Sequence, residues 1–194
     1  GIACREEATS VLLVSRVPLA RIQTLAAHTA SRSSVALARL LLGERWGVSP
    51  HLVPATPPLA TMLENADAAV IIGDPALAVK GRTGLLEVDL AAAWVEWTGL
   101  PFVFAVWGLA RGAPAALDEI LRGSLAWAEE HWETLLPRWA AAHRVPVSQA
   151  RVYLERTLTY RLGEAERAGL ELFLTLAARA GVLALRQEVW RAAS

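Results

Sequence analysis

The chain has 194 residues, 54% of them hydrophobic, and its 19 basic and 19 acidic residues give a formal net charge of zero. This length suits one sizeable domain or two small ones, and the neutral balance offers no electrostatic basis for binding nucleic acid or an anionic membrane. A single cysteine, Cys4, excludes an internal disulfide framework and a cysteine-rich metal site, and it indicates a structural thiol in a reducing compartment. The apolar runs stay shorter than the roughly 18 residues of a membrane span.

Strands and a helix alternate in the first part of the sequence. Apolar runs over residues 9–15 and 22–28 predict two buried strands, because they are short, aliphatic and bounded by turn residues. Apolar residues then recur at helical spacing over 35–46, and Gly43 and Gly47 are expected to end that helix.

The same alternation continues downstream. Residues 51–55 predict a third strand, residues 57–66 a helix that proline opens, and residues 67–77 a continuous apolar strand ending at Gly73. Strands that alternate with helices at this spacing favour a parallel sheet with helices on both faces. We therefore expect a compact α/β unit over residues 21–88.

The remaining sequence is predominantly helical. Residues 89–107 predict a helix that Gly99 ends in a left-handed conformation, followed by a strand over 102–107. From residue 115 onward, alanine, leucine, glutamate and arginine predominate, which is typical of helices. These helices are expected to break near Pro137, Pro146, Gly163 and Gly181.

Small hydroxyl residues surround an arginine where the strand over 22–28 meets the next helix. The cluster consists of Thr29, Ser31, Arg32, Ser33 and Ser34. The first N–H groups of a helix lack partners within it and carry partial positive charge, so short hydroxyl side chains there favour binding of an anion such as a carboxylate. Arg32 adds a bidentate donor. The alternative is an ordinary N-cap, which needs only one hydroxyl.

Two further polar residues stand at strand ends. Asp74 follows the strand within 67–77, at the edge where α/β proteins place ligands, although it could equally cap the next turn. Ser10 and Ser15 bracket the first strand, and either could be an ordinary strand-end hydroxyl. The histidines show no metal-ligand spacing, so no metal site is predicted; they are His28, His51, His131 and His143.

A tryptophan-rich motif over residues 94–107, W-x-x-W-T-G-L-P-F-V-F-A-x-W, resembles the chorismate dehydratase family. Four other segments are similar to that family in the same order: SVLLVSRVPL, SRSSVALARLLLGERWGV, ADAAVIIGDPAL and YLERTLTYRLG. The family catalyses the first step of the futalosine route to menaquinone biosynthesis. The resemblance implies a cytoplasmic enzyme with the two-lobed α/β fold of type II periplasmic binding proteins.

The resemblance also implies a division of the chain. Residues 1–20 would hold a hinge strand and a remnant of the first lobe, and residues 21–88 would form the second α/β lobe. Residues 89–107 would supply a helix and the return hinge strand, and C-terminal helices over 108–194 would pack on the first lobe. Family members begin with a further strand–helix–strand segment, including an asparagine thought to take part in the chemistry, and this chain is expected to start after it.

The implied reaction removes water from chorismate, a small dicarboxylate, to give 3-[(1-carboxyvinyl)oxy]benzoate. A proton leaves C3 and the hydroxyl group leaves C4, with neither metal nor other cofactor required. The resemblance gives Ser10 a substrate-contacting, catalytic role and Asp74 a polar contact with substrate. The residues expected to bind a carboxylate are Thr29, Ser31, Arg32, Ser33 and Ser34.

Two alternatives remain open at this stage. One is a non-catalytic solute-binding protein that closes on a small carboxylate. The other is the related 1,4-dihydroxy-6-naphthoate synthase of the same pathway, which shares the two-lobed fold. The tryptophan-rich motif favours the dehydratase. The sequence leaves the oligomeric state open.

Overall fold

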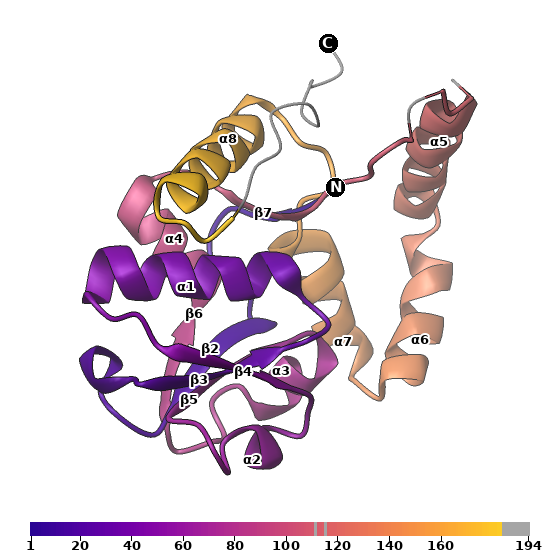
Figure 1. The fold of residues 1–194 in the computed structure, drawn as a ribbon. Helices are drawn as coiled ribbons and strands as arrows, with labels where there is room; N and C mark the ends of the chain where they lie inside the picture. Colours follow the sequence, from indigo (N-terminus) through magenta and orange to yellow (C-terminus); the bar gives the residue numbers. More distant parts are fainter. Residues whose placement is uncertain (111, 115, 184–194) are drawn as a thin grey trace.

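A five-stranded mixed sheet dominates the part of the chain that a computed structural model describes, residues 1–110, 112–114 and 116–183 (Figure 1). The strand order is β4-β3-β5-β2-β6. These strands are β2 (Val11–Ser15), β3 (Thr24–His28), β4 (His51–Ala55), β5 (Ala68–Ile72) and β6 (Leu86–Asp89). β3 pairs in parallel with β4 and β5, whereas β2 runs antiparallel to β5 and β6.

The prediction of a parallel sheet is therefore wrong at β2. The chain reverses between β2 and β3 over residues 16–23, which hold only the short helix η1 (Leu19–Arg21). A parallel crossover needs about a dozen residues or more, so this connection dictates the reversal. β2 lies between β5 and β6 in the same sheet as β3 and β4, and its role as a hinge strand stays a prediction.

Helices cover both faces of the sheet, as predicted. Side chains alternate along β2 and β5, so Leu13 and Val70 join one buried cluster with Leu37 of α1 (Arg32–Trp46). Leu12 and Ile71 join a second cluster on the opposite face, beside α2 (Leu59–Met62) and α3 (Asp74–Val79). Figure 1 shows α1 on one side of the sheet and α2 on the other. α2 is a single turn, shorter than the helix predicted over 57–66.

A second, two-stranded sheet joins β1 (Ile2–Cys4) to β7 (Phe102–Ala105) in antiparallel register. The helix α4 (Leu90–Thr98) precedes β7 in the chain and ends at Gly99, which has the predicted left-handed conformation with φ of 71°. Trp94 of α4 is fully buried and packs edge-on against Phe102 and against Phe173 of α8 (Glu164–Arg179). The first part of the motif that carried the family resemblance therefore packs in the core, whereas Trp107 at its end is exposed.

Cys4 is the last residue of β1 and is buried. Burial raises the pKa of the Cys4 thiol to about 11, so the thiol is protonated at neutral pH. This agrees with the structural role predicted from the sequence.

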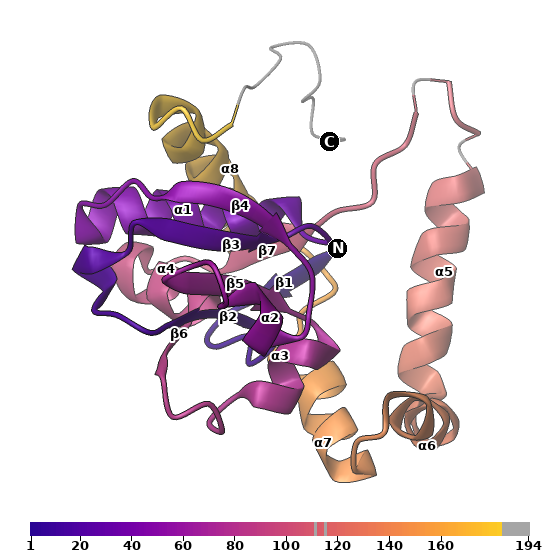
Figure 2. The same cartoon turned by 60° about the horizontal axis from the view of Figure 1, so that its bottom comes forward.

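The C-terminal arm, residues 116–157, consists of α5 (Ala116–Glu130), α6 (Trp132–His143), α7 (Val147–Arg151) and the π-helical segment η2 (Val152–Thr157). α5 and α6 extend away from both sheets (Figure 2). The chain breaks as predicted at Pro146 and Gly163, which precede α7 and α8. The predicted break near Pro137 is wrong, because Pro137 lies inside α6.

The packing of α6 explains why it continues past a proline. A proline inside a helix removes one backbone hydrogen bond and usually kinks the helix. Leu136 and Ala140 are buried on one face of α6, where they form a small cluster with Ala150 of α7. This burial offsets the missing hydrogen bond. α8 is followed by Gly181, with φ of 66°, as predicted, and the helical prediction for residues 184–194 lies outside the described residues.

Candidate functional site

A pocket of about 540 Å³ lies between the start of α1 and the two-stranded sheet. The lining residues are Ile2, Ala8, Ser10, Val11, Ala30, Ser31, Arg32, Ser33, Ser34, Ile72, Gly73, Phe104, Ala105, Tyr153 and Leu158. Five of the seven predicted site residues are in this set: Ser10, Ser31, Arg32, Ser33 and Ser34. The structure therefore brings Ser10 to the hydroxyl cluster at α1, across two different segments of chain.

Strand direction explains why these segments meet. β3 and β5 are parallel, so the loops that follow them leave the same edge of the sheet. β2 runs in the opposite direction and starts at that edge, where the Gly73 N–H donates to the Ser10 carbonyl oxygen over 2.8 Å. Antiparallel pairing of β2 with β5 thus places Ser10 beside the loop that precedes α1.

His28 fixes the ends of β3 and β5 relative to each other. Its Nδ1 accepts a hydrogen bond from the Ile72 N–H at 3.3 Å, which assigns any imidazole proton of the neutral ring to Nε2. The side chain is buried, and burial lowers the pKa of His28, so the ring is neutral at pH 7. No role for His28 was predicted from the sequence, and in the structure it supports the edge of the sheet.

Ser31 is the N-cap of α1. Its Oγ accepts the Ser34 N–H at 3.2 Å and donates to the Ser34 Oγ at 2.8 Å. The N-cap interpretation is thus confirmed for Ser31, and Ser34 is buried in the same interaction. The first two amides of the helix, at Arg32 and Ser33, have no acceptor within a helix by its geometry. These amides lie where the helix dipole is positive.

The polarity of the lining favours an anionic ligand with an apolar body. Arg32 is the one charged residue among the fifteen described lining residues, and it adds positive charge at the helix start. Other walls are apolar, formed by side chains such as Ile72, Phe104 and Leu158. A carboxylate at the start of α1 would therefore leave the rest of a small molecule against hydrocarbon.

Tyr153 of η2 is a site residue that the sequence reasoning missed. Its hydroxyl oxygen lies 2.8 Å from the Ser10 Oγ, although 143 residues separate the two in the chain. Burial raises the pKa of Tyr153, so the phenol is protonated at neutral pH. Tyr153 opens the segment YLERTLTYRLG that supported the family resemblance, and this was the available signal.

The other two predicted residues lie outside this described lining. Thr29 is exposed, and its N–H donates to the Ala55 carbonyl oxygen at the end of β4. Asp74 is the first residue of α3, after Gly73 at the N-cap position, and its carboxylate contacts Nδ1 of His143 at 2.5 Å. Asp74 therefore links α3 to the C-terminal arm.

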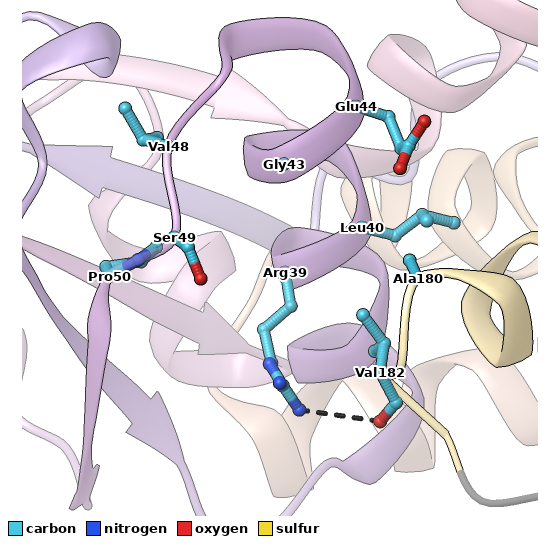
Figure 3. A pocket seen from close by; sticks show the side chains of 9 residues that line it. All are labelled: Arg39, Leu40, Gly43, Glu44, Val48, Ser49, Pro50, Ala180 and Val182. Atoms are coloured by element: carbon cyan, nitrogen blue, oxygen red, sulfur yellow. Dashed lines mark hydrogen bonds between the residues drawn. The ribbon is translucent and has the colours of Figure 1, made fainter.

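A second cavity, of about 200 Å³, lies beside the C-terminal half of α1 (Figure 3). Arg39 and Glu44 contribute charges of opposite sign to its lining, and Arg39 Nη1 donates to the Val182 carbonyl oxygen at 3.4 Å. This cavity lacks the hydroxyl cluster and is less than half the volume of the first. We therefore take the larger pocket as the candidate site.

Within residues 1–110, 112–114 and 116–183, histidine, cysteine, aspartate and glutamate side chains form no group of three or more that could hold a metal ion. Among the same described residues, no helix combines the length and the apolar character needed to cross a membrane.

Fold and pocket together define an α/β protein with a site suited to a small anionic molecule. The sequence pattern of the menaquinone biosynthesis family matches residues 1–179, and the chain belongs to that family. It is 33% identical over 189 residues to the chorismate dehydratase of Thermus thermophilus, covering 84% of this chain and 66% of that protein. It is 30% identical over 116 residues to the chorismate dehydratase of Campylobacter jejuni, covering 60% and 51%. The chain thus spans about two thirds of the first relative and half of the second.

Proposed function

We propose that this protein is a hydro-lyase that converts chorismate to 3-[(1-carboxyvinyl)oxy]benzoate in menaquinone biosynthesis. One observation carries the proposal: a pocket with positive charge and hydroxyl groups at the start of α1 and apolar walls opposite, in a chain related to chorismate dehydratases. Chorismate has matching chemistry, with carboxylates on a largely hydrocarbon frame.

The proposed binding mode places one substrate carboxylate at the start of α1. Arg32 would form a bidentate ion pair with it, and the Ser33 hydroxyl and the first two amides of α1 would donate further hydrogen bonds. Ser31 and Ser34 would hold this end of the helix in place, since their hydroxyls are already paired with each other. The ring would lie against the apolar wall that includes Phe104 and Leu158, which excludes water from it.

The proposed reaction is an elimination. A proton leaves C3, its electron pair forms the new ring double bond, and the C4–O bond breaks as the departing hydroxide gains a proton and leaves as water. Ser10 is proposed to contact the substrate oxygen atoms at this centre. The fifteen described lining residues include neither carboxylate nor imidazole side chains, so we assign them to binding and orientation, and proton acceptance at C3 to a group outside this lining.

We further propose that the chain is part of a two-lobed fold of the type II periplasmic-binding-protein kind, working in the cytoplasm. The pocket supports this arrangement because its walls come from two separate sheets. Ser10, Ile72 and the start of α1 belong to the five-stranded sheet and its connections, and Ile2 and Phe104 belong to the two-stranded sheet. In a two-lobed protein the ligand lies between the lobes, and a site between two sheets has this arrangement if each sheet belongs to one lobe.

The test is incubation of the intact protein with chorismate, followed by chromatography and mass spectrometry. We expect chorismate to disappear and an aromatic product lighter by one water to accumulate. Recovery of unchanged chorismate would overturn the proposal. Saturable binding of chorismate without conversion would point instead to the solute-binding alternative.

A further inference from the structure

Ser10 and Tyr153 form a hydrogen-bonded pair at the pocket, and the proposed function gives Ser10 a contact with substrate but gives Tyr153 no particular role. Ser10 is only 4% exposed, and its Oγ lies 2.8 Å from the Tyr153 hydroxyl oxygen. Both residues line the pocket. A serine hydroxyl has one proton to donate, so the partner of its oxygen decides where that proton can point.

Each half of the pair is fixed by its own surroundings. The Ser10 carbonyl oxygen accepts the Gly73 N–H at 2.8 Å, which anchors the start of β2. Tyr153 stacks near Trp139 of α6, with 6.2 Å between ring centroids, and its carbonyl oxygen accepts the Leu158 N–H at 3.2 Å. The π-helical turn of η2 thus delivers Tyr153 to the pocket, and such turns are frequent at functional sites.

The chemistry of the two hydroxyl groups favours one direction of donation. A phenol, with an ordinary pKa of about 10, is a far stronger acid than an aliphatic alcohol and hence the better hydrogen-bond donor. The aliphatic oxygen of serine is correspondingly the better acceptor. Burial keeps the phenol protonated, because the pKa of Tyr153 is raised.

We propose that Tyr153 is a positioning residue that donates its hydroxyl proton to the Ser10 Oγ and thereby leaves the Ser10 proton free to point into the pocket. Ser10 then presents a hydrogen-bond donor to an oxygen atom of the ligand, either a carboxylate or the hydroxyl group that departs. The identity of that ligand rests on the proposed function, whereas the direction of the hydrogen bond does not.

The kinetic test compares Tyr153→Phe, Ser10→Ala and the double variant in the intact protein, with chorismate as substrate. We expect Tyr153→Phe to lower kcat about 3- to 10-fold with KM nearly unchanged, because one oriented hydrogen bond is lost in a retained ring. Ser10→Ala is expected to lower kcat further, and the double variant to be no slower than Ser10→Ala. Tyr160→Phe is the matched control, since Tyr160 is a part-buried tyrosine outside the described lining.

Losses that multiply in the double variant, or an unaltered kcat in Tyr153→Phe, would overturn the proposal, because Tyr153 would then act independently of Ser10 or not at all. A structural role alone would lower the stability of Tyr153→Phe without this dependence on Ser10.

A second measurement separates this inference from the proposed function. In protein labelled with ¹³C at tyrosine Cζ, the Tyr153 resonance is the one that disappears in Tyr153→Phe. We expect that resonance, and not the Tyr160 resonance, to move in Ser10→Ala. If it moves while the unaltered protein leaves chorismate intact, the hydrogen bond stands and the dehydratase proposal fails. If it stays in place, the positioning role of Tyr153 fails.

Discussion

The five-stranded sheet with its covering helices buries far more of its side chains than the C-terminal arm does. In the sheet, residues alternate between two buried clusters, and strands such as β2 are buried at every position. In the arm, every residue of α5 is at least partly exposed, and α6 contributes only Leu136 and Ala140 to burial. The candidate pocket nevertheless needs both regions, because Ser10 comes from one and Tyr153 from the other. Stability is therefore concentrated in the sheet, while the site depends on how the arm meets it.

The largest expected effect is a contrast between two tryptophans. Trp94 is fully buried and Trp127 of α5 is 53% exposed. Trp94→Ala is expected to lower the free energy of unfolding by about 3–5 kcal/mol, because it leaves a cavity between α4 and α8. Trp127→Ala is expected to change it by less than about 1 kcal/mol. Urea denaturation of both variants measures the difference. Equal losses in the free energy of unfolding would contradict the conclusion that stability is concentrated in the sheet and its covering helices.

Two glycines give the next largest contrast, with opposite signs. A Cβ atom added at Gly169 of α8 would lie 2.1 Å from the Pro101 carbonyl oxygen, so Gly169→Ala is expected to destabilise by about 1–3 kcal/mol. A Cβ atom added at Gly123 of α5 meets open space among the described residues, so Gly123→Ala is expected to stabilise by up to about 1 kcal/mol. Thermal unfolding of both variants tests this, and a stabilising Gly169→Ala would show that α8 is not in close contact with Pro101.

A smaller effect is expected from the exposed arginine at the pocket. Arg32→Ala is expected to raise KM for chorismate about tenfold, because a charge-assisted hydrogen bond is lost at a partly solvated position. Arg32→Lys keeps the positive charge but loses the two parallel N–H donors of the guanidinium group. Its KM is expected to lie between that of the unaltered protein and that of Arg32→Ala. Steady-state kinetics with the intact protein measures both. An unaltered KM would leave carboxylate binding to the amides and hydroxyls of α1.

The smallest effect is expected where the arm touches α3. The Asp74 and His143 side chains are 54% and 34% exposed, so Asp74→Ala is expected to change the free energy of unfolding by less than about 1 kcal/mol. KM for chorismate is expected to stay close to that of the unaltered protein, because Asp74 lies outside the described lining. A clear rise in KM would show that Asp74 contacts the substrate, as the family resemblance implied.

The sequence was most informative where chemistry is local. Short apolar runs correctly predicted β2 to β5, and the hydroxyl residues at positions 31–34 led to the start of α1. Strand direction could not be predicted in the same way, because a strand buried on both faces has the same apolar pattern whichever way it runs. The connection between β2 and β3, not their side chains, determines that direction.

Tyr153 shows the other limit of sequence reasoning. Its contact with Ser10 spans 143 residues, and it depends on a π-helical turn whose sequence is not distinct from that of an α-helix. The helix break predicted near Pro137 is wrong for a related reason. The packing of Leu136 and Ala140 on a neighbouring helix outweighs the local tendency of proline to end a helix. Tertiary packing decided both outcomes.

The pocket walls come from β1, α1 and η2, three segments that lie far apart in the sequence. A molecule held there cross-links these segments without a covalent bond, so occupancy and cooperative unfolding are thermodynamically coupled. Saturating ligand will therefore raise the melting temperature of the whole protein, and not only of the segments that the ligand touches.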